Sequence, residues 1–593
     1  MDTMKGLKRT AYCGTFRSSD IGKEVTVGGF VQRQRDLGSL IFVDLRDRTG
    51  ILQLAFDETS DKEIFDKAFT LRSEYVVMAK GVIRERSSKN KDIPTGDIEL
   101  EVNDLRILSK AETPPFEIVE NSNTGEAMRL KYRYLDLRRP DLQKNILMRH
   151  KIAKIARDYF YENDFIEIET PMMIKSTPEG ARDYVVPSRI QNGKFYALPQ
   201  SPQIYKQLTM IAGFDRYIQL ARCFRDEDLR ADRQPEFTQI DIEMSFVDCD
   251  DIMNMTEGFI KRVMKETIDV EIADIPRITF DEAMNLYGSD KPDTRFGMTI
   301  QDISGWASKT DFSVFSDTVK NGGSVKAIVA ENGAEKYSRK KIDKLTEHAK
   351  GIGAKGLAYI RWAEDEPNCS FAKFLKEGEL EELINTLNVK KGDAVFIVSD
   401  KTRKALTIMG ALRLIVAREL EMIPENKWNY LWITEMPFFE LDEETNEWVA
   451  AHHPFTMPMD ESIQYLETDK SKVKAQSFDL VLNGTELLSG SMRITDCELQ
   501  NKMFELLGMS QEEIDAKFGF LVDAYHYAAP PHGGMGLGLD RLSMLICGVD
   551  SLRDVVAFPK VQNASEPMSG APSYIDETQL DELALAITRT DEE

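Results

Sequence analysis

The chain has 593 residues and a formal net charge of −24, with 100 acidic residues against 76 lysines and arginines. Its 42% hydrophobic and 30% charged residues exclude a disordered or low-complexity chain, and the length predicts about four domains. No run of about eighteen apolar residues is present, so we expect no membrane span, no signal peptide and a cytoplasmic location. The six cysteines form no Cys-x-x-Cys pair, which argues against a zinc ribbon and a disulfide framework.

The charge is unevenly distributed along the chain. Residues 129–157 contain ten lysines and arginines, whereas the last eighteen residues contain seven acids and only Arg589 as a base. Because phosphate contacts are made locally by Lys and Arg, the negative total does not exclude nucleic-acid binding. In the alternative interpretation, solvated helix faces account for about half of these charges.

The first hundred residues alternate as short β-strands with glycine turns between them. Strand-like runs lie at 25–27, 41–45, 51–56, 75–83 and 98–102, and a polar periodic segment at about 60–72 predicts one helix. Five strands and a helix fit a small oligonucleotide-binding (OB) barrel, although other β-domains give the same count. Pro114-Pro115 then marks a linker, a helix is expected at 145–163, and a strand at 165–170 ends at Pro171.

Residues 217–246 predict a strand-loop-strand hairpin whose loop carries arginines at 225, 230 and 233. Because strand side chains alternate, Ile240, Ile242, Met244 and Phe246 share one face, and Gln239, Asp241, Glu243 and Ser245 share the other. An acidic face over a sheet is costly unless it meets solvent or a ligand, and the arginines suit carboxylate or phosphate. A salt-bridged surface hairpin is the alternative.

A glycine-rich segment, residues 533–542, leads from a strand into a helix near Arg541. Closely spaced glycines let a ligand approach the backbone, and a helix start favours an anion, so a nucleotide is a candidate ligand. The spacing matches neither a dinucleotide-binding fingerprint nor a P-loop. Tight strand-helix packing is the alternative reason for the glycines.

Asn483-Gly484 between two apolar runs is a strong hairpin signal. A two-residue turn there pairs Val481 with Glu486 and makes Asp479 and Glu486 diagonal neighbours on one face. Two carboxylates facing the same space suit Mg²⁺ that arrives with phosphates, and solvent exposure is the alternative.

The adjacent histidines His452 and His453 are read as neighbours on a strand, whose side chains point to opposite faces. We therefore expect at most one of them to face a site. With six histidines in the whole chain, no zinc constellation is predicted.

Three of these segments occur in a recognisable order: the strand ending at Pro171, the hairpin with residues 224–228 and 233–237, and the closing segment 536–541. Together they resemble motifs 1, 2 and 3 of the class II aminoacyl-tRNA synthetases, and neither class I signature is present. Residues 35–42, 200–206 and 452–455 further resemble the bacterial-type aspartyl-tRNA synthetases of subclass b. The resemblance covers essentially the whole chain.

The resemblance implies an α+β multidomain fold. Its expected parts are an OB-fold anticodon-binding domain at 1–112, a hinge at 113–144, a catalytic antiparallel sheet flanked by helices at 145–290 and 426–562, an inserted α+β domain at 291–425, and a C-terminal extension at 563–593. Motif 1 implies a homodimer.

The resemblance also implies a two-step reaction. ATP and L-aspartate give aspartyl-adenylate and pyrophosphate, and aspartate then passes to the terminal ribose of tRNA(Asp). Aspartate would be held by Glu179, Gln203, Lys206, Arg225, Asp241, His452 and Arg493. ATP would be held by Arg225, Asp226, Glu227, Gln234, Glu486, Gly538, Leu539, Asp540 and Arg541, with Arg225 and Arg541 catalytic. Asp479 and Glu486 would hold Mg²⁺, and Arg35, Phe42 and Gln53 would read the anticodon.

These roles agree with elementary chemistry, since adenylyl transfer needs positioned cations more than acid-base residues. Lys206 and Arg493 facing a substrate carboxylate should favour aspartate over asparagine by several kcal/mol. Leu37 resembles the barrel loop of relatives strict for aspartate tRNA, and relaxed use of asparagine tRNA stays open.

Three other functions are compatible with parts of this pattern. An asparaginyl- or lysyl-tRNA synthetase shares the barrel and the motifs, although lysine would require acids in place of Lys206 and Arg493. A tRNA-independent amino-acid ligase or regulatory protein would keep the fold without aminoacylation. An RNA-binding protein with a degenerate catalytic domain would show no aspartate-dependent chemistry with ATP.

Overall fold

The computed structural model describes residues 2–57, 60–177, 181–227, 233–442 and 447–588. Its contacts divide the chain into two compact units. The first holds the described residues within Met1–His150, Leu229–Arg233 and Cys547–Tyr574, and the second holds those within Lys151–Asp228, Gln234–Ile546 and Ile575–Glu593. Among the described helices, none combines the length and the apolar character that a membrane crossing requires.

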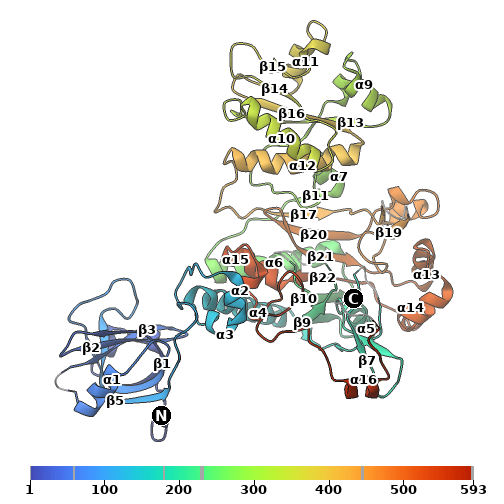
Figure 1. The fold of residues 1–593 in the computed structure, drawn as a ribbon. Helices are drawn as coiled ribbons and strands as arrows, with labels where there is room; N and C mark the ends of the chain where they lie inside the picture. The colour runs from blue at the N-terminus through green and yellow to red at the C-terminus, as the bar shows by residue number, and fades with distance from the viewer. Residues whose placement is uncertain (1, 58–59, 178–180, 228–232, 443–446, 589–593) are drawn as a thin grey trace. The chain divides into compact units, whose positions relative to one another are not determined.

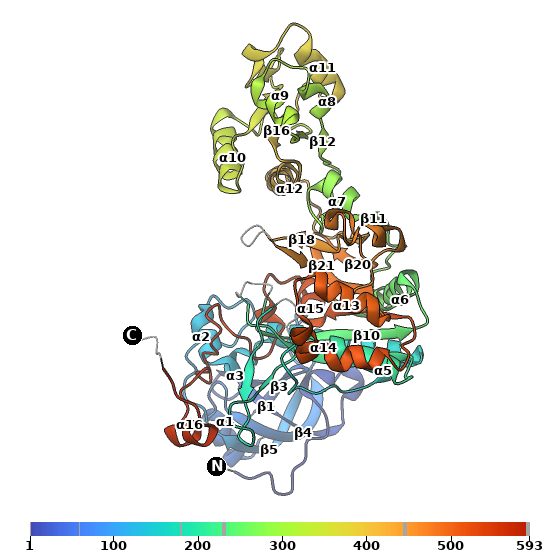
Figure 2. The same ribbon diagram turned by 90° about the vertical axis from the view of Figure 1, so that its right-hand side faces the viewer.

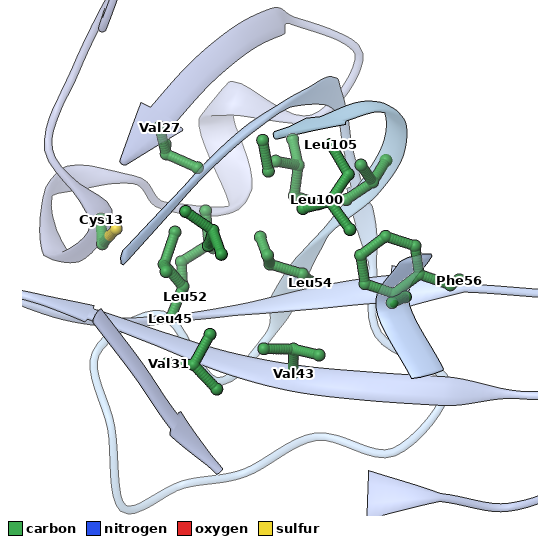
Figure 3. Close-up of a cluster of buried hydrophobic side chains, with 14 of the residues drawn as sticks. Cys13, Val27, Val31, Val43, Leu45, Leu52, Leu54, Phe56, Leu100 and Leu105 are labelled. Carbon is green, nitrogen blue, oxygen red and sulfur yellow. The ribbon is translucent and has the colours of Figure 1, made fainter. Parts of the chain in front are cut away.

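The N-terminal strands close into a five-stranded barrel, which confirms the predicted OB fold. The order is β1-β2-β3-β5-β4. The bounds are β1 (Glu24–Asp36), β2 (Ile41–Asp47), β3 (Gly50–Phe56), α1 (Lys62–Phe69), β4 (Val76–Glu85) and β5 (Ile98–Ser109). Alternate residues such as Val43, Leu45, Leu52 and Leu54 point into one apolar core (Figure 3). Strand periodicity therefore fills the barrel and leaves the other face polar.

Three helices follow: α2 (Glu126–Lys131), α3 (Arg133–Asp136) and α4 (Pro140–Glu162). Part of the predicted basic region is used internally, because the fully buried Asp136 accepts from Arg133 at 2.6 Å and Arg139 at 2.9 Å and lies 3.4 Å from Arg129. Arg133 also donates to the carbonyl of Ala557 at 2.8 Å. These arginines are therefore structural cations rather than a solvated helix face.

An eight-stranded sheet with the order β11-β17-β20-β21-β22-β10-β9-β6 forms the centre of the second unit (Figure 1). Its strands are β6 (Ile166–Glu167), β9 (Arg216–Phe224), β10 (Glu236–Ser245), β11 (Arg277–Thr279), β17 (Tyr430–Thr434), β20 (Ser477–Leu482), β21 (Thr485–Met492) and β22 (His532–Gly538). All neighbours are antiparallel except β11 with β17 and β6 with β9, so the predicted antiparallel sheet is confirmed. This order makes β21, β22 and β10 neighbours in the sheet, although β10 is distant from the other two in the sequence.

Two local predictions for this sheet are wrong. The strand expected at 165–170 is reduced to the two residues of β6. Phe246, expected on the buried face of β10, lies beyond the end of the strand, is 72% exposed and has a φ of 56°. Its amide donates to the carbonyl of Pro531 at 2.7 Å, so the chain turns away before the alternation reaches it.

The sheet is accompanied by α5 (Gln203–Ile211), α6 (Cys249–Ile268), α13 (Cys497–Leu506), α14 (Gln511–Tyr525) and α15 (Leu539–Cys547), which Figure 2 shows alongside it. The other short elements are β7 (Val185–Pro187), β8 (Phe195–Ala197), α7 (Phe280–Tyr287), β18 (Phe439–Leu441), β19 (Trp448–Ala450) and α16 (Glu577–Leu583). Helix α5 packs against β10, which brings its side chains over that strand.

A separate five-stranded sheet occupies residues 301–400, in the order β12-β13-β16-β14-β15. Its elements are β12 (Gln301–Asp302), α8 (Ser304–Ala307), α9 (Ser313–Lys320), β13 (Ser324–Ala330), α10 (Arg339–Gly351), β14 (Ala358–Arg361), β15 (Asn368–Cys369), α11 (Glu379–Thr386), β16 (Ala394–Asp400) and α12 (Thr402–Glu419). Along β16, Phe396 and Val398 join one apolar cluster and Val395 and Ile397 join another. The sheet is therefore covered on both faces.

Candidate active site

The polar face of β10 is built against a strand of glycines. Glu243 pairs with Gly534 of β22 and Asp241 pairs with Gly536. A Cβ at Gly534 would collide with the Glu243 carboxylate, and one at Gly536 would lie 3.2 Å from the Asp241 carboxylate. Gly534 and Gly536 thus make room for the acids of the neighbouring strand, a role that neither the nucleotide nor the tight-packing interpretation anticipated.

Two cations lie on these acids. Lys206 of α5 places its Nζ 2.6 Å from Asp241 Oδ1 and 3.1 Å from Glu243 Oε2. Arg493, which follows β21, donates through Nε at 2.8 Å and Nη2 at 3.2 Å to the two oxygens of Glu243. All four side chains are at most 4% exposed. The acidic face therefore meets buried cations, and Lys206 and Arg493 are paired with carboxylates of the protein itself.

The electrostatics of the two acids differ. Burial alone would raise the pKa of Glu243, but Arg493 and Lys206 outweigh it and lower that pKa to about 2. Burial dominates at Asp241, so its pKa is raised although Lys206 opposes the shift. Glu243 is consequently the firmly ionised partner of the cations.

Three histidines border this cluster. His453 Nε2 lies 2.9 Å from Arg493 Nη1, and His452 Nδ1 lies 3.3 Å from Ser489 Oγ, so both adjacent imidazoles contact site residues. The expectation that at most one would do so is wrong because residues 451 and 452 form a bend and His453 lies outside any strand. Burial lowers the pKa of His452 to about 4 and that of His453 well below its ordinary value, aided by Arg493. His532 is buried, and its pKa is lowered by burial.

The β20–β21 hairpin places Asp479 and Glu486 as a second acidic pair. The turn residues Asn483 and Gly484 have φ of 51° and 86°, and Val481 pairs with Glu486 as predicted. An irregularity between Leu480 and Val481, which the sequence did not predict, shifts the register so that Asp479 faces Ser489. The pKa of Asp479 is raised well above its ordinary value by burial and by the charge of Glu486, so the two carboxylates interact.

This pair fits a divalent cation only in part. Oxygen ligands suit Mg²⁺, and within the described residues Asp479 Oδ1 is buried without a hydrogen-bond partner. No group of three or more His, Cys, Asp or Glu side chains in the described part of the chain is arranged to hold a metal. Two carboxylates would therefore need phosphate oxygens or water to complete a Mg²⁺ site.

A further group of predicted residues surrounds the start of α15. Arg541 Nη1 donates to the carbonyl of Glu486 at 2.7 Å, and Asp540 Oδ2 accepts from the amide of Thr238 at 2.9 Å. Gly538 is the last residue of β22 and Leu539 the first of α15. These contacts bring motif-3 residues to β21 and β10.

Arg225, Asp226, Glu227 and Gln234 lie at the ends of the β9–β10 hairpin. The guanidinium of Arg225 lies 5.2 Å from the centre of the Phe237 ring. The Asp226 amide donates to the carbonyl of Arg182 at 3.1 Å. Gln234 is buried, and Glu227 precedes residues that the structure does not describe. Glu179 also lies outside the described residues.

Several polar atoms in this region are buried without a hydrogen-bond partner among the described residues. They are Gln203 Nε2, Arg225 Nε, Asp479 Oδ1 and His532 Nε2. Because buried polar groups are nearly always hydrogen-bonded, such a concentration is typical of a site that binds a polar ligand. The arrangement can hold an anionic side chain at Lys206 and Arg493, with a phosphate at Arg225.

The candidate barrel residues also meet. Arg35 Nη2 lies 2.8 Å from Asp44 Oδ1 and 2.9 Å from Gln53 Oε1, and Gln53 Nε2 donates to Glu99 at 2.6 Å. Phe42 pairs with Arg35 across β1 and β2. The side chains of Arg35, Asp44, Gln53 and Glu99 thus form one polar network across the four adjacent strands β1, β2, β3 and β5.

Four residues of the cluster were not predicted from the sequence: Glu243, His453, Ser491 and His532. The alternation of β10 already places Glu243 beside Asp241, so that residue could have been found. His453 and Ser491 contact Arg493, and His532 lies near Glu243. The sequence does not show that β21 pairs with β22 and β22 with β10, which brings Ser491 and His532 to the cluster.

Comparison with known proteins places this geometry in a family. The model of class II tRNA synthetases (D, K and N) matches residues 125–562, and that of the OB-fold nucleic acid binding domain matches residues 25–108. The chain is 54% identical over 592 residues to an aspartate–tRNA ligase of Ruminiclostridium cellulolyticum, covering 99% of this chain and 100% of the relative. It is 53% identical to an aspartate–tRNA(Asp/Asn) ligase of Caldanaerobacter subterraneus, covering 99% of each.

Solved structures share the fold at low identity. An asparaginyl-tRNA synthetase from Pyrococcus horikoshii, complexed with asparaginyl-adenylate, aligns with a TM-score of 0.60 and 18% identity over 93% of this chain and 98% of that one. An aspartyl-tRNA synthetase from Entamoeba histolytica aligns with a TM-score of 0.56 and 19% identity over 93% and 92%. On the match over residues 125–562 and the full-length identity to these relatives, the chain belongs to the class II tRNA synthetases of the D, K and N group.

Proposed function

We propose that this chain ligates aspartate to tRNA in two steps: L-aspartate and ATP form aspartyl-adenylate and pyrophosphate, and the aspartyl group then passes to the 3′-terminal ribose of tRNA. Full-length relatives at 52–54% identity carry the name aspartate–tRNA ligase, which supports this activity. The observation within the site that carries the proposal is the buried pair of cations, Lys206 and Arg493.

The specificity follows from charge. Lys206 and Arg493 are the buried cations of the site, and a ligand carboxylate gains charge-assisted hydrogen bonds from these two desolvated groups. The side-chain amide of asparagine would place its NH2 group against the N–H donors of Lys206 and Arg493, and the ammonium of lysine would be repelled by their charge. Aspartate should therefore be selected over asparagine and lysine by differential binding.

The phosphate end of the site is assigned to arginines. Arg225 would contact the α-phosphate and the aspartate carboxylate, with Asp226, Glu227, Gln234 and Arg541 around ATP. Gln203 and Glu179 would hold the amino acid, with His452 beside it. Positioned guanidinium groups stabilise charge that develops during adenylyl transfer, so no acid-base triad is needed.

A divalent cation is used with ATP in this family, and we assign it as Mg²⁺ held by Asp479 and Glu486. It would neutralise phosphate charge when bound. The chain's contribution is the acidic pair itself, whose repulsion is relieved by a cation. The partly buried backbone carbonyl of Glu486 additionally anchors Arg541 beside that pair.

The tRNA is assigned to the barrel, where Arg35, Phe42 and Gln53 would contact anticodon bases by guanidinium, ring and amide groups. We take tRNA(Asp) as the substrate, a homodimer as the assembly and the cytoplasm as the location. The proposed domains are 1–112, 113–144, 145–290, 291–425, 426–562 and 563–593. Relatives named for tRNA(Asp) and for tRNA(Asp/Asn) both match the chain, so charging of the two tRNAs should be compared directly.

Pyrophosphate exchange into ATP tests the activation step. The purified protein with Mg²⁺ is supplied with aspartate, asparagine or lysine, and an Arg225→Ala variant is measured beside it. Exchange with aspartate alone, lost in the variant, is the expected result. Absence of exchange with all three amino acids in the wild type would refute the proposed function.

A further inference from the structure

Within the described part of the chain, Glu243 contacts both cations that are proposed to bind the substrate side chain. Its Oε1 accepts from Arg493 Nε at 2.8 Å, and its Oε2 lies 3.2 Å from Arg493 Nη2 and 3.1 Å from Lys206 Nζ. It is fully buried on β10, and the space for its carboxylate exists because Gly534 has no side chain. Two like charges are thus held together by one carboxylate.

The contacts of Arg493 and Lys206 leave each cation with one further donor. A guanidinium has five N–H groups. Arg493 uses two on Glu243, and its Nη1 faces His453 Nε2 at 2.9 Å and Ser491 Oγ, which leaves one N–H on Nη2. The Lys206 ammonium has three N–H groups: two face Asp241 and Glu243, and the third is directed only to a long 3.4 Å contact with the carbonyl of Ile242.

We propose that Glu243 is a positioning residue for aspartate recognition: by accepting from Arg493 and Lys206 together, it fixes both cations so that the remaining donor of each serves one substrate carboxylate. This inference rests on the proposed function. Without the carboxylate the two cations repel each other, and Arg493 loses the bidentate contact that fixes the plane of its guanidinium. Glu243 acts through these cations and does not itself bind the substrate.

Glu243→Gln is the decisive variant, because the amide keeps the shape but removes the negative charge and replaces one of the two accepting oxygens with an NH2 donor. We expect the KM for aspartate in pyrophosphate exchange to rise at least about tenfold, while the KM for ATP stays within about twofold. Glu243→Asp keeps the charge but is one methylene shorter, so it should recover part of the aspartate affinity.

The matched control is Glu74→Gln in the barrel. Glu74 is a buried glutamate that also contacts two arginines, Arg46 at 2.9 Å and Arg138 at 2.9 Å, but it lies outside the site. It should lower the melting temperature without changing the KM for aspartate. A purely structural role for Glu243 predicts the same behaviour in both variants.

The outcomes separate the inference from the proposed function. Wild-type protein without aspartate-dependent exchange refutes the function, and the variants then need no interpretation. If the wild type is active, an unchanged aspartate KM in Glu243→Gln, or equal rises in both KM values, overturns the positioning role. If Glu243→Gln does not fold, Glu243→Asp decides by its aspartate KM, and loss of the fold in both variants assigns Glu243 to the core instead.

Discussion

Replacing Lys206 by methionine removes one charge from the centre of the site and keeps the volume of the side chain. The ammonium is 2% exposed and lies 2.6 Å from Asp241 and 3.1 Å from Glu243. At the shorter distance the attraction between unit charges is about 6 kcal/mol for an effective dielectric constant of about 20. Because desolvation offsets part of this attraction, breaking such a buried pair costs about 3–5 kcal/mol of folding free energy.

The same change should weaken aspartate binding. Loss of one charge-assisted hydrogen bond amounts to about 1.5–3 kcal/mol, or roughly a 10- to 150-fold rise in the KM for aspartate. The loss of stability should depend on pH. Asp241 already has a raised pKa because it is buried, and removal of Lys206 raises it further. A raised native-state pKa stabilises at low pH and loses that effect as pH rises through it, so the variant should be less destabilised at about pH 5.5 than at about pH 8.

Pyrophosphate exchange at varied aspartate and thermal melting at the two pH values test this prediction. Lys326→Met is the matched control, since Lys326 is a buried lysine of β13 paired with Asp302 at 2.9 Å and belongs to another sheet. The control should lose stability but keep the aspartate KM. An unchanged aspartate KM in Lys206→Met, or a loss of stability equal at both pH values, would refute the reasoning.

Three further predictions concern the metal pair, the glycine strand and the barrel. Asp479→Asn should raise the Mg²⁺ concentration that half-saturates pyrophosphate exchange by about tenfold or more. In the wild type that concentration should fall as pH rises, because Asp479 has a raised pKa and a proton competes with the cation. Exchange at varied Mg²⁺ and pH measures both effects, and a half-saturating concentration that does not change with pH would contradict this prediction. Gly534→Ala should destabilise the fold by about 1–3 kcal/mol, since a methyl group there collides with Glu243; a melting temperature equal to that of the wild type would contradict the packing argument. Arg35→Ala should raise the KM for tRNA by roughly tenfold in aminoacylation without changing pyrophosphate exchange, and an effect on exchange would place Arg35 outside a purely tRNA-binding role.

The sequence predicted regular elements well where one local rule decides them. The barrel strands follow apolar alternation, and the Asn483-Gly484 turn follows from residues that tolerate positive φ. The predictions failed where long-range packing decides: Phe246 leaves the buried face because its amide binds Pro531, and the strand before Pro171 is shortened to β6. The contact between Phe246 and Pro531 and the early end of β6 cannot be predicted from the residues that neighbour them in the sequence.

The candidate site shows the same division. The acidic face of β10 was visible in the alternation of Asp241 and Glu243, yet its partners were not, because Lys206 reaches it from a helix and Arg493 from the end of β21. The reason for the glycines in β22 was also hidden, since it depends on which strand lies beside them. Only the order of strands in the sheet reveals that the closing glycines and the acids form one structure.

A crystal structure with a non-hydrolysable aspartyl-adenylate analogue would show which side chains bind the aspartate carboxylate. We predict that the side-chain carboxylate of the analogue accepts hydrogen bonds from Lys206 and Arg493 while Arg493 keeps its contact with Glu243, and that Arg225 contacts the phosphate mimic. A carboxylate bound elsewhere, or an Arg493 that leaves Glu243 to reach it, would contradict the account.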